Sequence, residues 1–465
     1  MNQQQQDTIC AIATAQGGAI GTIRVSGPEA IRLTSRIFFP KKKGKLLEEQ
    51  PPYTLTFGQI RKGDEVIDEV LVALYRAPHS YTGEESTEIT CHGSPYILQQ
   101  VLQLLMAAGA RLAQPGEFTQ RAFLNGKMDL SQAEAVADLI ASTNAASHRL
   151  AVNQLRGGFS QELSALRDRL LHFTSLLELE LDFSDHEELE FADRNELSQL
   201  AQEIANRLEQ LAHTFSIGNA VKNGVPVAII GETNAGKSTL LNLLLRDDRA
   251  IVSPIHGTTR DVIEDTISIE GITFRFIDTA GIRETQDTIE SLGIERTFQK
   301  MESADIVLWL IDATQATTQL EQLAPQILPH CSTQQLLLVF NKTDLLPTFQ
   351  LPPLPSTFPP HTRCIAISAK CQRHTQELQQ LLVEAAHLPE ISQSDVIITN
   401  VRHYEALTHA LEAIRRAQQG LELQLSGDFI AQDIRECIFH LSDIVGAVTT
   451  DEVLSNIFKH FCIGK

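Results

Sequence analysis

Long hydrophobic runs are missing from this chain of 465 residues. A helix needs about 20 consecutive apolar residues to cross a membrane, and no segment approaches that length. The residues before Asp7 are rich in glutamine and uncharged, whereas a secretory signal peptide begins with positive charge. We therefore expect a cytoplasmic protein without a membrane-spanning segment or a signal peptide.

Cysteine patterns are also lacking. The seven cysteines are scattered along the chain and show neither pairing nor the spacing of metal ligands. This argues against a disulfide framework and a cysteine-based metal site, and it suits the reducing cytosol.

Positive charge is scarce, since 38 Lys and Arg residues stand against 58 Asp and Glu residues and the formal net charge is −20. Such a chain is a poor stand-alone binder of nucleic acid, because phosphate contacts need clustered Lys and Arg. The run Lys41–Lys43 is short and is interpreted as a solvated loop. Any role on RNA would need a local basic patch or a basic partner.

The length of the chain allows about three domains, and a 43% hydrophobic content can fill several cores. Residues 7–92 are mainly β-rich segments separated by Gly, Pro and Lys, which predicts a small α+β domain ending near residue 118. Strands are predicted at 9–13, 20–25, 53–60 and 66–75, and a helix at 95–108.

The hydrophobic period changes after this first domain. Apolar residues recur at gaps of three and four in 159–177, 197–211 and 404–414, which predicts three amphipathic helices. Two more helices are predicted at 428–441 and 451–461.

A glycine-rich segment stands between a strand and a helix. Residues 231–238 read GETNAGKS, follow the β-branched run 225–230, and open the apolar stretch 239–245. This is the sequence context of a phosphate-binding P-loop rather than of an ordinary glycine turn.

Each P-loop residue type has a physical role. Gly231 and Gly236 let the backbone curl so that successive N–H groups point at phosphate, and the helix N-terminus adds partial positive charge. Lys237 can reach the β- and γ-phosphates, and Ser238 can ligate Mg²⁺. The segment therefore predicts a nucleotide site.

Two later segments predict that the nucleotide is a guanine nucleotide. The sequence Asn341-Lys342-Thr343-Asp344 follows a predicted strand at 336–340. A carboxylate there can accept hydrogen bonds from N1–H and N2–H₂ of guanine, a donor pair that adenine lacks. Ala369 and Lys370 follow a predicted strand at 364–368 and are placed to contact the guanine carbonyl.

The γ-phosphate end has its own motifs. Asp278 and Gly281 follow a predicted strand at 274–277; Asp278 would hold Mg²⁺ through water, and the Gly281 N–H would meet the γ-phosphate. Thr258-Thr259 lie in the preceding loop and can close on Mg²⁺ before hydrolysis and open after it.

Four motifs in this order, each at a strand end, predict a GTPase, because ligands of open α/β sheets bind at the carboxyl ends of strands. Ser238 and Thr259 are the expected Mg²⁺ ligands. The expected GTP-binding residues are Asn234, Ala235, Gly236, Lys237, Ser238, Thr239, Ser253, Thr258, Thr259, Asp278, Gly281, Asn341, Lys342, Asp344, Ser368, Ala369 and Lys370.

The module departs from the pattern of Ras-like proteins at Ile282, where those proteins carry a glutamine that orients water. An apolar side chain cannot orient water, so another polar group must. The acidic residues Glu284, Asp287 and Glu290 are candidates, although most such residues are solvated loop charges.

No arginine finger is evident within the chain. Arg260 and Arg283 are candidates, but loop arginines more often lie on the surface or form ion pairs. The charge of the transition state therefore needs another cation.

Helical segments on both sides of the GTPase module favour a GTPase inserted into a helical domain, with two independent bundles as the alternative. The predicted fold class is multidomain, α/β and α+β, with an inserted Ras-like P-loop GTPase domain. The expected domains are an N-terminal domain at 1–118, a first helical part at 119–221, the GTPase at 222–382 and a second helical part at 383–465.

The chain resembles, over essentially its whole length, the tRNA modification GTPase family MnmE, also called TrmE. The GTPase motifs are shared with many families, whereas the N- and C-terminal segments are specific. The segments that carry the resemblance are Gly18–Gly27 (GAIGTIRVSG), Ser80–Glu84 (SYTGE), Pro115–Phe118 (PGEF), Arg121–Leu130 (RAFLNGKMDL), Gly257–Asp261 (GTTRD) and Cys462–Lys465 (CIGK).

The resemblance implies an enzyme that adds a carboxymethylaminomethyl or aminomethyl group to C5 of the wobble uridine, U34, of certain tRNAs. It implies a heterotetramer with the flavoprotein MnmG (GidA), which binds FAD and uses NADH. The one-carbon unit would come from 5-formyl- or 5,10-methylene-tetrahydrofolate bound by the N-terminal domain. By similarity, Arg24, Glu88, Lys127 and Lys465 would contact the folate, whose pterin edge and glutamate tail suit a carboxylate and basic groups; otherwise they are surface residues.

The resemblance also implies a homodimer through the N-terminal domain and a second dimerisation of the GTPase domains in the transition state. A K⁺ ion would take the place of the arginine finger, held by Asn234, Thr258 and the carbonyls around Ser253 and Ile255. Such an ion would supply the cation that the chain otherwise lacks.

Glu290 aligns with the catalytic acid of the family, which orients the attacking water through a bridging water. With Thr259 it would carry hydrolysis, and the opening of the GTPase domains would then move the helical domain. Cys462 is either a nucleophile, activated by a nearby cation, or a residue that only packs beside the folate.

Two other functions remain open at this stage. Related GTPase domains serve in ribosome assembly or translation, but such proteins should carry basic extensions, and this chain is acidic. The other alternative is a structural scaffold whose folate site is vestigial.

Overall fold

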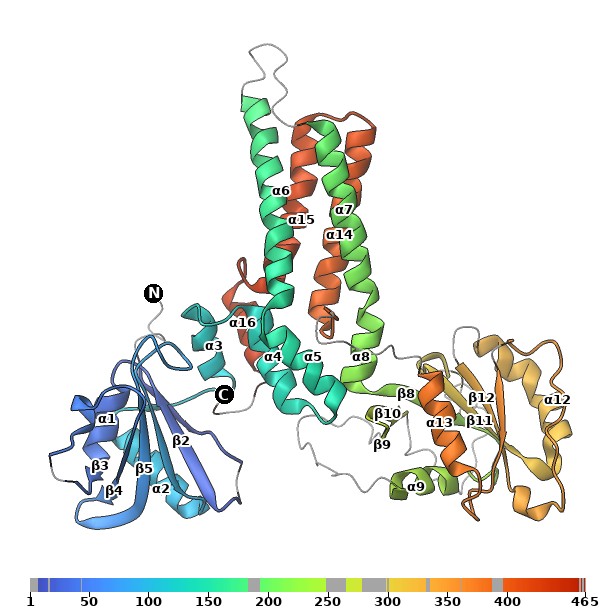
Figure 1. The fold of residues 1–465 in the computed structure, drawn as a ribbon, viewed down its shortest axis with the longest axis horizontal. Helices are drawn as coiled ribbons and strands as arrows, with labels where there is room; N and C mark the ends of the chain where they lie inside the picture. The colour runs from blue at the N-terminus through green and yellow to red at the C-terminus, as the bar shows by residue number, and fades with distance from the viewer. Residues whose placement is uncertain are drawn as a thin grey trace. The chain divides into compact units, whose positions relative to one another are not determined.

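The computed structural model describes residues 7–15, 17–42, 44–182, 193–247, 265–277, 298, 301–331, 335–360, 362–386, 396–459, 461 and 464 (Figure 1). The chain forms two compact units. The first comprises residues 1–141, 151–208 and 406–465, and the second comprises residues 142–150 and 209–405. The second unit is thus inserted in the chain of the first, as the helical segments on both sides of the P-loop module predicted. The four domain bounds expected from the sequence stay predictions.

A seven-stranded sheet forms the N-terminal part of the first unit, in the order β3-β4-β5-β6-β2-β1-β7. Neighbouring strands are antiparallel except β1 and β7, which are parallel. The strands are β1 (Ile9–Ile12), β2 (Ile20–Ser26), β3 (Phe38–Pro40), β4 (Thr54–Lys62), β5 (Glu65–Tyr75), β6 (Ser86–His92) and β7 (Arg111–Leu112).

Helices α1 (Ala30–Ile37) and α2 (Pro95–Ala108) share one hydrophobic core with this sheet. In β5, Val70, Val72 and Leu74 are buried, whereas Leu71 between them is exposed, as the two-residue period of a half-buried strand requires. The four predicted strands and the predicted helix at 95–108 are confirmed. Strands β3, β6 and β7 and helix α1 were missed, because none of these segments was recognised as a periodic pattern.

The remaining helices of the first unit include a group of four, α6, α7, α14 and α15, whose side chains pair across the helices. Arg169 of α6 pairs with Glu203 of α7, and Arg435 of α15 pairs with Glu178 of α6. The predicted apolar stripes are buried in the bundle core, as Leu170 and Ile204 show. The helices are α3 (Glu117–Leu124), α4 (Leu130–Ala141), α5 (Ala145–Leu155), α6 (Gly158–Asp182), α7 (Arg194–His213), α14 (Val401–Glu422), α15 (Gly427–Val445) and α16 (Asp451–Phe458). Of these, residues 145–150 of α5, 209–213 of α7 and 401–405 of α14 belong to the second unit.

The second unit contains a six-stranded sheet in the order β13-β12-β11-β8-β10-β9. Its strands are parallel except for the hairpin of β9 and β10. The elements are α8 (Phe215–Asn223), β8 (Val225–Ile230), α9 (Lys237–Asp247), β9 (Asp265–Ile269), β10 (Ile272–Phe276), β11 (Ile306–Asp312), α12 (Ala316–Ile327), β12 (Gln335–Asn341), β13 (Arg363–Ala366) and α13 (Thr375–Ala385).

Both faces of this sheet are covered. Leu308 of β11 belongs to a core shared with α9 and α13, whereas its neighbour Trp309 belongs to a core shared with α12. Strands buried on both faces lose the alternation of polar and apolar residues, and β11 reads IVLWLID. The predicted strands at 225–230, 274–277, 336–340 and 364–368 are confirmed in outline, while the central strand β11 was not singled out.

None of the helices in the described ranges, the 25-residue α6 included, is both long enough and apolar enough to span a bilayer.

Candidate functional site

The loop between β8 and α9 has the shape that the P-loop sequence predicts. Gly231 and Gly236 have φ of 144° and 100°, a backbone region that residues with a Cβ rarely adopt. A Cβ on Gly231 would clash with the carbonyl oxygen of Leu310, and one on Gly236 would clash with the side chain of Asn341. Both positions therefore require glycine for conformation and for space.

Lys237, the first residue of α9, folds back over this loop. Its Nζ donates to the carbonyl oxygens of Gly231 and Glu232 at 2.5 and 2.8 Å. An ammonium group binds a phosphate more strongly than a neutral carbonyl, since the hydrogen bond is then charged on both sides. Ser238, the expected Mg²⁺ ligand, follows in the first turn of α9 and is half-buried.

Asn341, at the end of β12, connects three loops. Its Nδ2 donates to the carbonyl oxygen of Ala235 in the P-loop (2.8 Å), and its Oδ1 accepts from the N–H of Ala369 (2.9 Å). The side chain is buried, with 3% exposure. Asn341 therefore holds the loops of the site together.

The carboxylate of Asp344, predicted to bind guanine, is held from the third loop. Ser368 Oγ donates to Asp344 Oδ1 at 2.6 Å. This hydrogen bond, together with the weaker influence of Lys370 and Arg373, lowers the pKa of Asp344 below its usual value, so the group is an acceptor at neutral pH. Such an acceptor matches the paired N–H donors of guanine.

Lys342 makes a contact that the sequence did not indicate. Its Nζ donates to Asp312 Oδ2 at 2.7 Å, and Asp312 also accepts from the N–H and hydroxyl of Thr314. Burial acts to raise the pKa of Asp312, but these hydrogen bonds and Lys342 outweigh it and lower the pKa. The signal that could have revealed Asp312 is its place at the end of the unrecognised strand β11.

Part of the predicted site lies outside the described residues. These residues are Ser253, Ile255, Thr258, Thr259, Asp278, Gly281 and Glu290, together with Cys462 and Lys465 at the C-terminus. Their predicted roles stay predictions. Among the described residues, the structure brings Ala235 and Gly236 of the P-loop to Asn341, whereas Asn234 and Thr239 are exposed.

The N-terminal domain contains a second candidate site, built on Arg24 and Glu88. These residues face each other on β2 and β6, and Arg24 Nη2 lies 2.9 Å from Glu88 Oε1. The Arg24 guanidinium also lies 5.2 and 5.7 Å from the ring centroids of Tyr81 and Phe118. The sequence predicted Arg24 and Glu88 as ligand contacts but did not predict the aromatic residues beside them.

Lys127 lies over the segment that carries Tyr81. Its Nζ donates to the carbonyl oxygen of Pro78 at 3.0 Å, and its side chain covers Gly83. Burial raises the pKa of Tyr81, whose hydroxyl pairs with Thr119 at 2.9 Å. This side of the N-terminal domain thus combines two cations, one carboxylate and aromatic surface.

The C-terminal tail reaches the same domain. Gly464 is buried with φ of 96°, and a Cβ there would clash with the carbonyl oxygen of Ile12 at the end of β1. Gly116 is similarly close to the backbone of Phe458 in α16. The residue before Lys465 therefore lies at the end of β1 in the N-terminal sheet.

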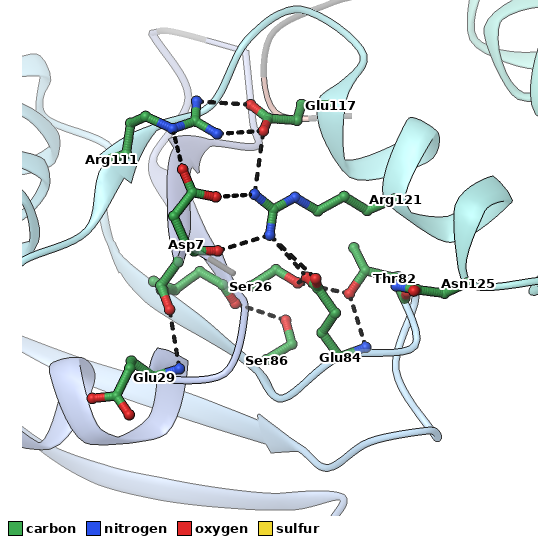
Figure 2. A network of polar contacts seen from close by, with 12 residues as sticks. Asp7, Ser26, Glu29, Thr82, Glu84, Ser86, Arg111, Glu117, Arg121 and Asn125 are labelled. Atoms are coloured by element: carbon green, nitrogen blue, oxygen red, sulfur yellow. Dashed lines mark hydrogen bonds and ion pairs between the residues drawn. The ribbon is translucent and has the colours of Figure 1, made fainter. Parts of the chain in front are cut away.

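Several motif residues of the N-terminal domain form an internal network (Figure 2). Arg121 pairs with Asp7 (2.6 Å), Glu84 (3.2 Å) and Glu117 (3.3 Å), and Arg111 pairs with Asp7 (2.6 Å) and Glu117 (2.5 Å). Burial acts to raise the pKa values of Asp7 and Glu117, but the arginine hydrogen bonds outweigh it and lower both. These motif residues join α3 to the N-terminal strands.

A mostly parallel sheet covered on both faces, a glycine loop between β8 and α9 and an aspartate held after β12 together define a P-loop GTPase. Sequence comparison gives the family. The model "MnmE helical domain" matches residues 130–462, and "GTP-binding protein TrmE N-terminus" matches residues 8–127. The chain belongs to the MnmE family of tRNA modification GTPases and is a GTP hydrolase.

Individual relatives cover the whole length. The tRNA modification GTPase MnmE of Bacteroides fragilis is 70% identical over 464 residues, which is 99% of this chain and 100% of that protein. The protein of the same name from Christiangramia forsetii is 50% identical, with 99% of each chain covered. Among solved structures, a point variant of Aquifex aeolicus Era bound to GDP and AlF4⁻ is 26% identical, with a TM-score of 0.24, and the match covers 40% of this chain and 66% of that chain.

Proposed function

We propose that the chain couples GTP hydrolysis to modification of certain tRNAs at C5 of the wobble uridine U34. It adds a carboxymethylaminomethyl or aminomethyl group together with the FAD-dependent partner MnmG (GidA), in the cytoplasm. Relatives that are 70% identical carry the name tRNA modification GTPase. The observation that carries the proposal is the Arg24–Glu88 pair beside aromatic rings, in the same chain as a guanine-reading loop.

The chemistry of the residues around Arg24 and Glu88 supports binding of a tetrahydrofolate derivative. A pterin offers N–H donors to a carboxylate such as Glu88, a flat ring to the aromatic surface of Tyr81, and a glutamate tail to Arg24 or Lys127. The buried Gly464 supports a contribution from the adjacent Lys465. When bound, the folate would supply the one-carbon unit, and the role of this chain is to bind and orient it. Cys462 either attacks as a nucleophile or packs beside the folate.

We propose that the nucleotide site binds GTP together with Mg²⁺ and K⁺. Lys237 and the N-terminus of α9 would bind the phosphates, Ser238 and Thr259 would hold Mg²⁺, and Asp344 would read guanine. Asn234, with φ of 67° in the P-loop, would bind K⁺ together with Ser253, Ile255 and Thr258. Glu290 and Thr259 would then carry hydrolysis.

The outer face of the N-terminal sheet supports homodimerisation through this domain. Phe39, Leu55, Phe57 and Leu71 are all exposed there, Leu55 by 66%, and Phe57 and Leu71 are direct cross-strand neighbours. Contiguous apolar side chains on the surface are typical of interaction sites. We propose that GTP and K⁺ bring the GTPase domains of the dimer together and that hydrolysis separates them.

Mass spectrometry of wobble nucleosides from cells lacking this protein tests the proposal. The modified uridine should disappear, return with the wild-type gene, and stay absent with Arg24→Ala. The same variant, purified, should lose affinity for 5-formyl-tetrahydrofolate in calorimetry while GTP hydrolysis continues. Modified uridine persisting in the deletion strain would overturn the proposal.

A further inference from the structure

Gln319 is a buried polar residue of the GTPase module that lies outside every recognised motif. It sits on α12 with 4% exposure. Its Nε2 donates to Glu232 Oε2 at 2.7 Å, and its Oε1 accepts from the backbone N–H of Asp312 at 3.0 Å. The nitrogen and the oxygen of one side-chain amide therefore both hydrogen-bond to residues at the nucleotide site.

The two partners leave the amide only one orientation. An ionised carboxylate only accepts hydrogen bonds, and a backbone N–H only donates. If the amide were turned over, oxygen would face oxygen on one side and N–H would face N–H on the other. The assignment of the amide therefore follows from its neighbours, and the side chain acts as a spacer of fixed length between them.

The two partners belong to the two halves of the nucleotide site. Glu232 is in the P-loop, and its carbonyl oxygen accepts from Lys237 Nζ. The carboxylate of Asp312 accepts from Lys342 Nζ, which belongs to the guanine-reading segment. A continuous series of polar contacts thus runs from the phosphate-binding lysine to the guanine-reading loop, with Gln319 at its centre.

We infer that Gln319 is a positioning residue, which sets the distance between the P-loop and the guanine-reading loop and so determines affinity for guanine nucleotides. A nucleotide spans both loops, so each contact forms fully only when the loops are correctly spaced. A pre-organised site avoids the free-energy cost of ordering on binding. Gln319 acts through Glu232 and Asp312.

The substitution Gln319→Glu in the full-length protein tests this inference. It keeps the acceptor for the Asp312 N–H but places a carboxylate against Glu232, so the P-loop is pushed away. We expect GDP and GTP to bind about tenfold more weakly, the factor that loss of one charge-assisted hydrogen bond gives. KM for GTP should rise accordingly, while kcat at saturating GTP changes little.

A second substitution should rescue the first. In the double variant Glu232→Gln with Gln319→Glu, the donor and acceptor are exchanged. The amide introduced at position 232 donates to the carboxylate introduced at position 319, which still accepts from the N–H of Asp312. Nucleotide affinity should return to within about threefold of wild type. Glu232→Gln alone should have a small effect, because its amide oxygen can still accept from Gln319.

Gln322→Glu is the matched control, because Gln322 lies on the exposed side of the same helix. It should leave nucleotide affinity unchanged. Thermal unfolding without nucleotide, followed in parallel, separates loss of fold from loss of positioning. The inference is overturned if folded Gln319→Glu binds GDP like wild type, or if the double variant is folded but binds no better than Gln319→Glu.

Discussion

Replacing Arg121 with methionine tests whether the network of Figure 2 holds the N-terminal domain together. Methionine retains much of the apolar volume of the arginine stem but removes the guanidinium. The Arg121 side chain is 5% exposed and faces the carboxylates of Asp7, Glu84 and Glu117. The substitution therefore leaves Asp7 and Glu117 with Arg111 as their remaining cationic partner in the described network, and it removes the ion pair of Glu84 with Arg121.

The size of the effect follows from burial. Removing one partner of a buried ion pair costs about 3–5 kcal/mol. Arg111 still pairs with Asp7 and Glu117 in the variant, so we expect the lower end, about 3 kcal/mol. Arg111→Met is the matched control. The Arg111 side chain is 38% exposed, so solvent screens its ion pairs, and the substitution should lower the free energy of unfolding by about 1 kcal/mol or less.

The effect should depend on pH with a defined sign. Asp7 and Glu117 have lowered pKa values in the folded state. Their stabilisation is present above the ordinary carboxyl pKa of about 4 and is lost as the pH falls through the lowered values. The difference between wild type and Arg121→Met should therefore be largest near pH 7 and shrink below about pH 4.

Hydrogen–deuterium exchange of peptides spanning 7–26 and 111–124 measures the local free energy of opening. The single tryptophan, Trp309, lies in β11 of the second unit, so its fluorescence serves as an internal control and should show an unchanged unfolding transition. Equal protection of these peptides in wild type and variant at pH 7 would refute the reasoning. So would a Trp309 transition that shifts as much as the N-terminal peptides do.

Three further results are expected. Asp344→Asn should weaken GDP binding by about 1–3 kcal/mol, the value of a paired base-edge contact, and should favour xanthosine diphosphate, whose C2 carbonyl needs a donor; unchanged GDP affinity in calorimetry would contradict this. Gly236→Ala should abolish binding of a fluorescent GDP analogue, because a Cβ meets Asn341 and the backbone has φ of 100°, whereas the exposed Gly271→Ala serves as a control for positive φ alone. Hydrolysis should be about tenfold or more faster in K⁺ than in Na⁺, since about 1.4 kcal/mol of transition-state stabilisation gives that factor; equal rates would remove the monovalent cation from the proposal.

The sequence predicted best what depends on local backbone. The P-loop glycines are recognisable because their positive φ and close neighbours exclude other residues, and Asp344 is recognisable by its place after a buried strand. The bundle helices were predicted because a stripe such as Leu163, Leu170 and Leu177 repeats with the period of a helix.

Pairings between distant segments of the chain could not be predicted from the sequence. Arg24 and Glu88 meet only because β2 and β6 pair in one register, and Arg121 meets Asp7 across 114 positions of the chain. Gln319 was missed for the same reason: on a helix it is one of several glutamines, and only the fold places it between Glu232 and Asp312.

The close packing of Gly464 has a practical consequence for producing the protein. An affinity tag fused behind Lys465 would begin two residues after Gly464, which packs closely against β1, and the tag would have to turn away from the sheet at once. Purification handles are better placed at the other terminus, and preparations trimmed by carboxypeptidases should be rejected by intact-mass measurement before any folate titration.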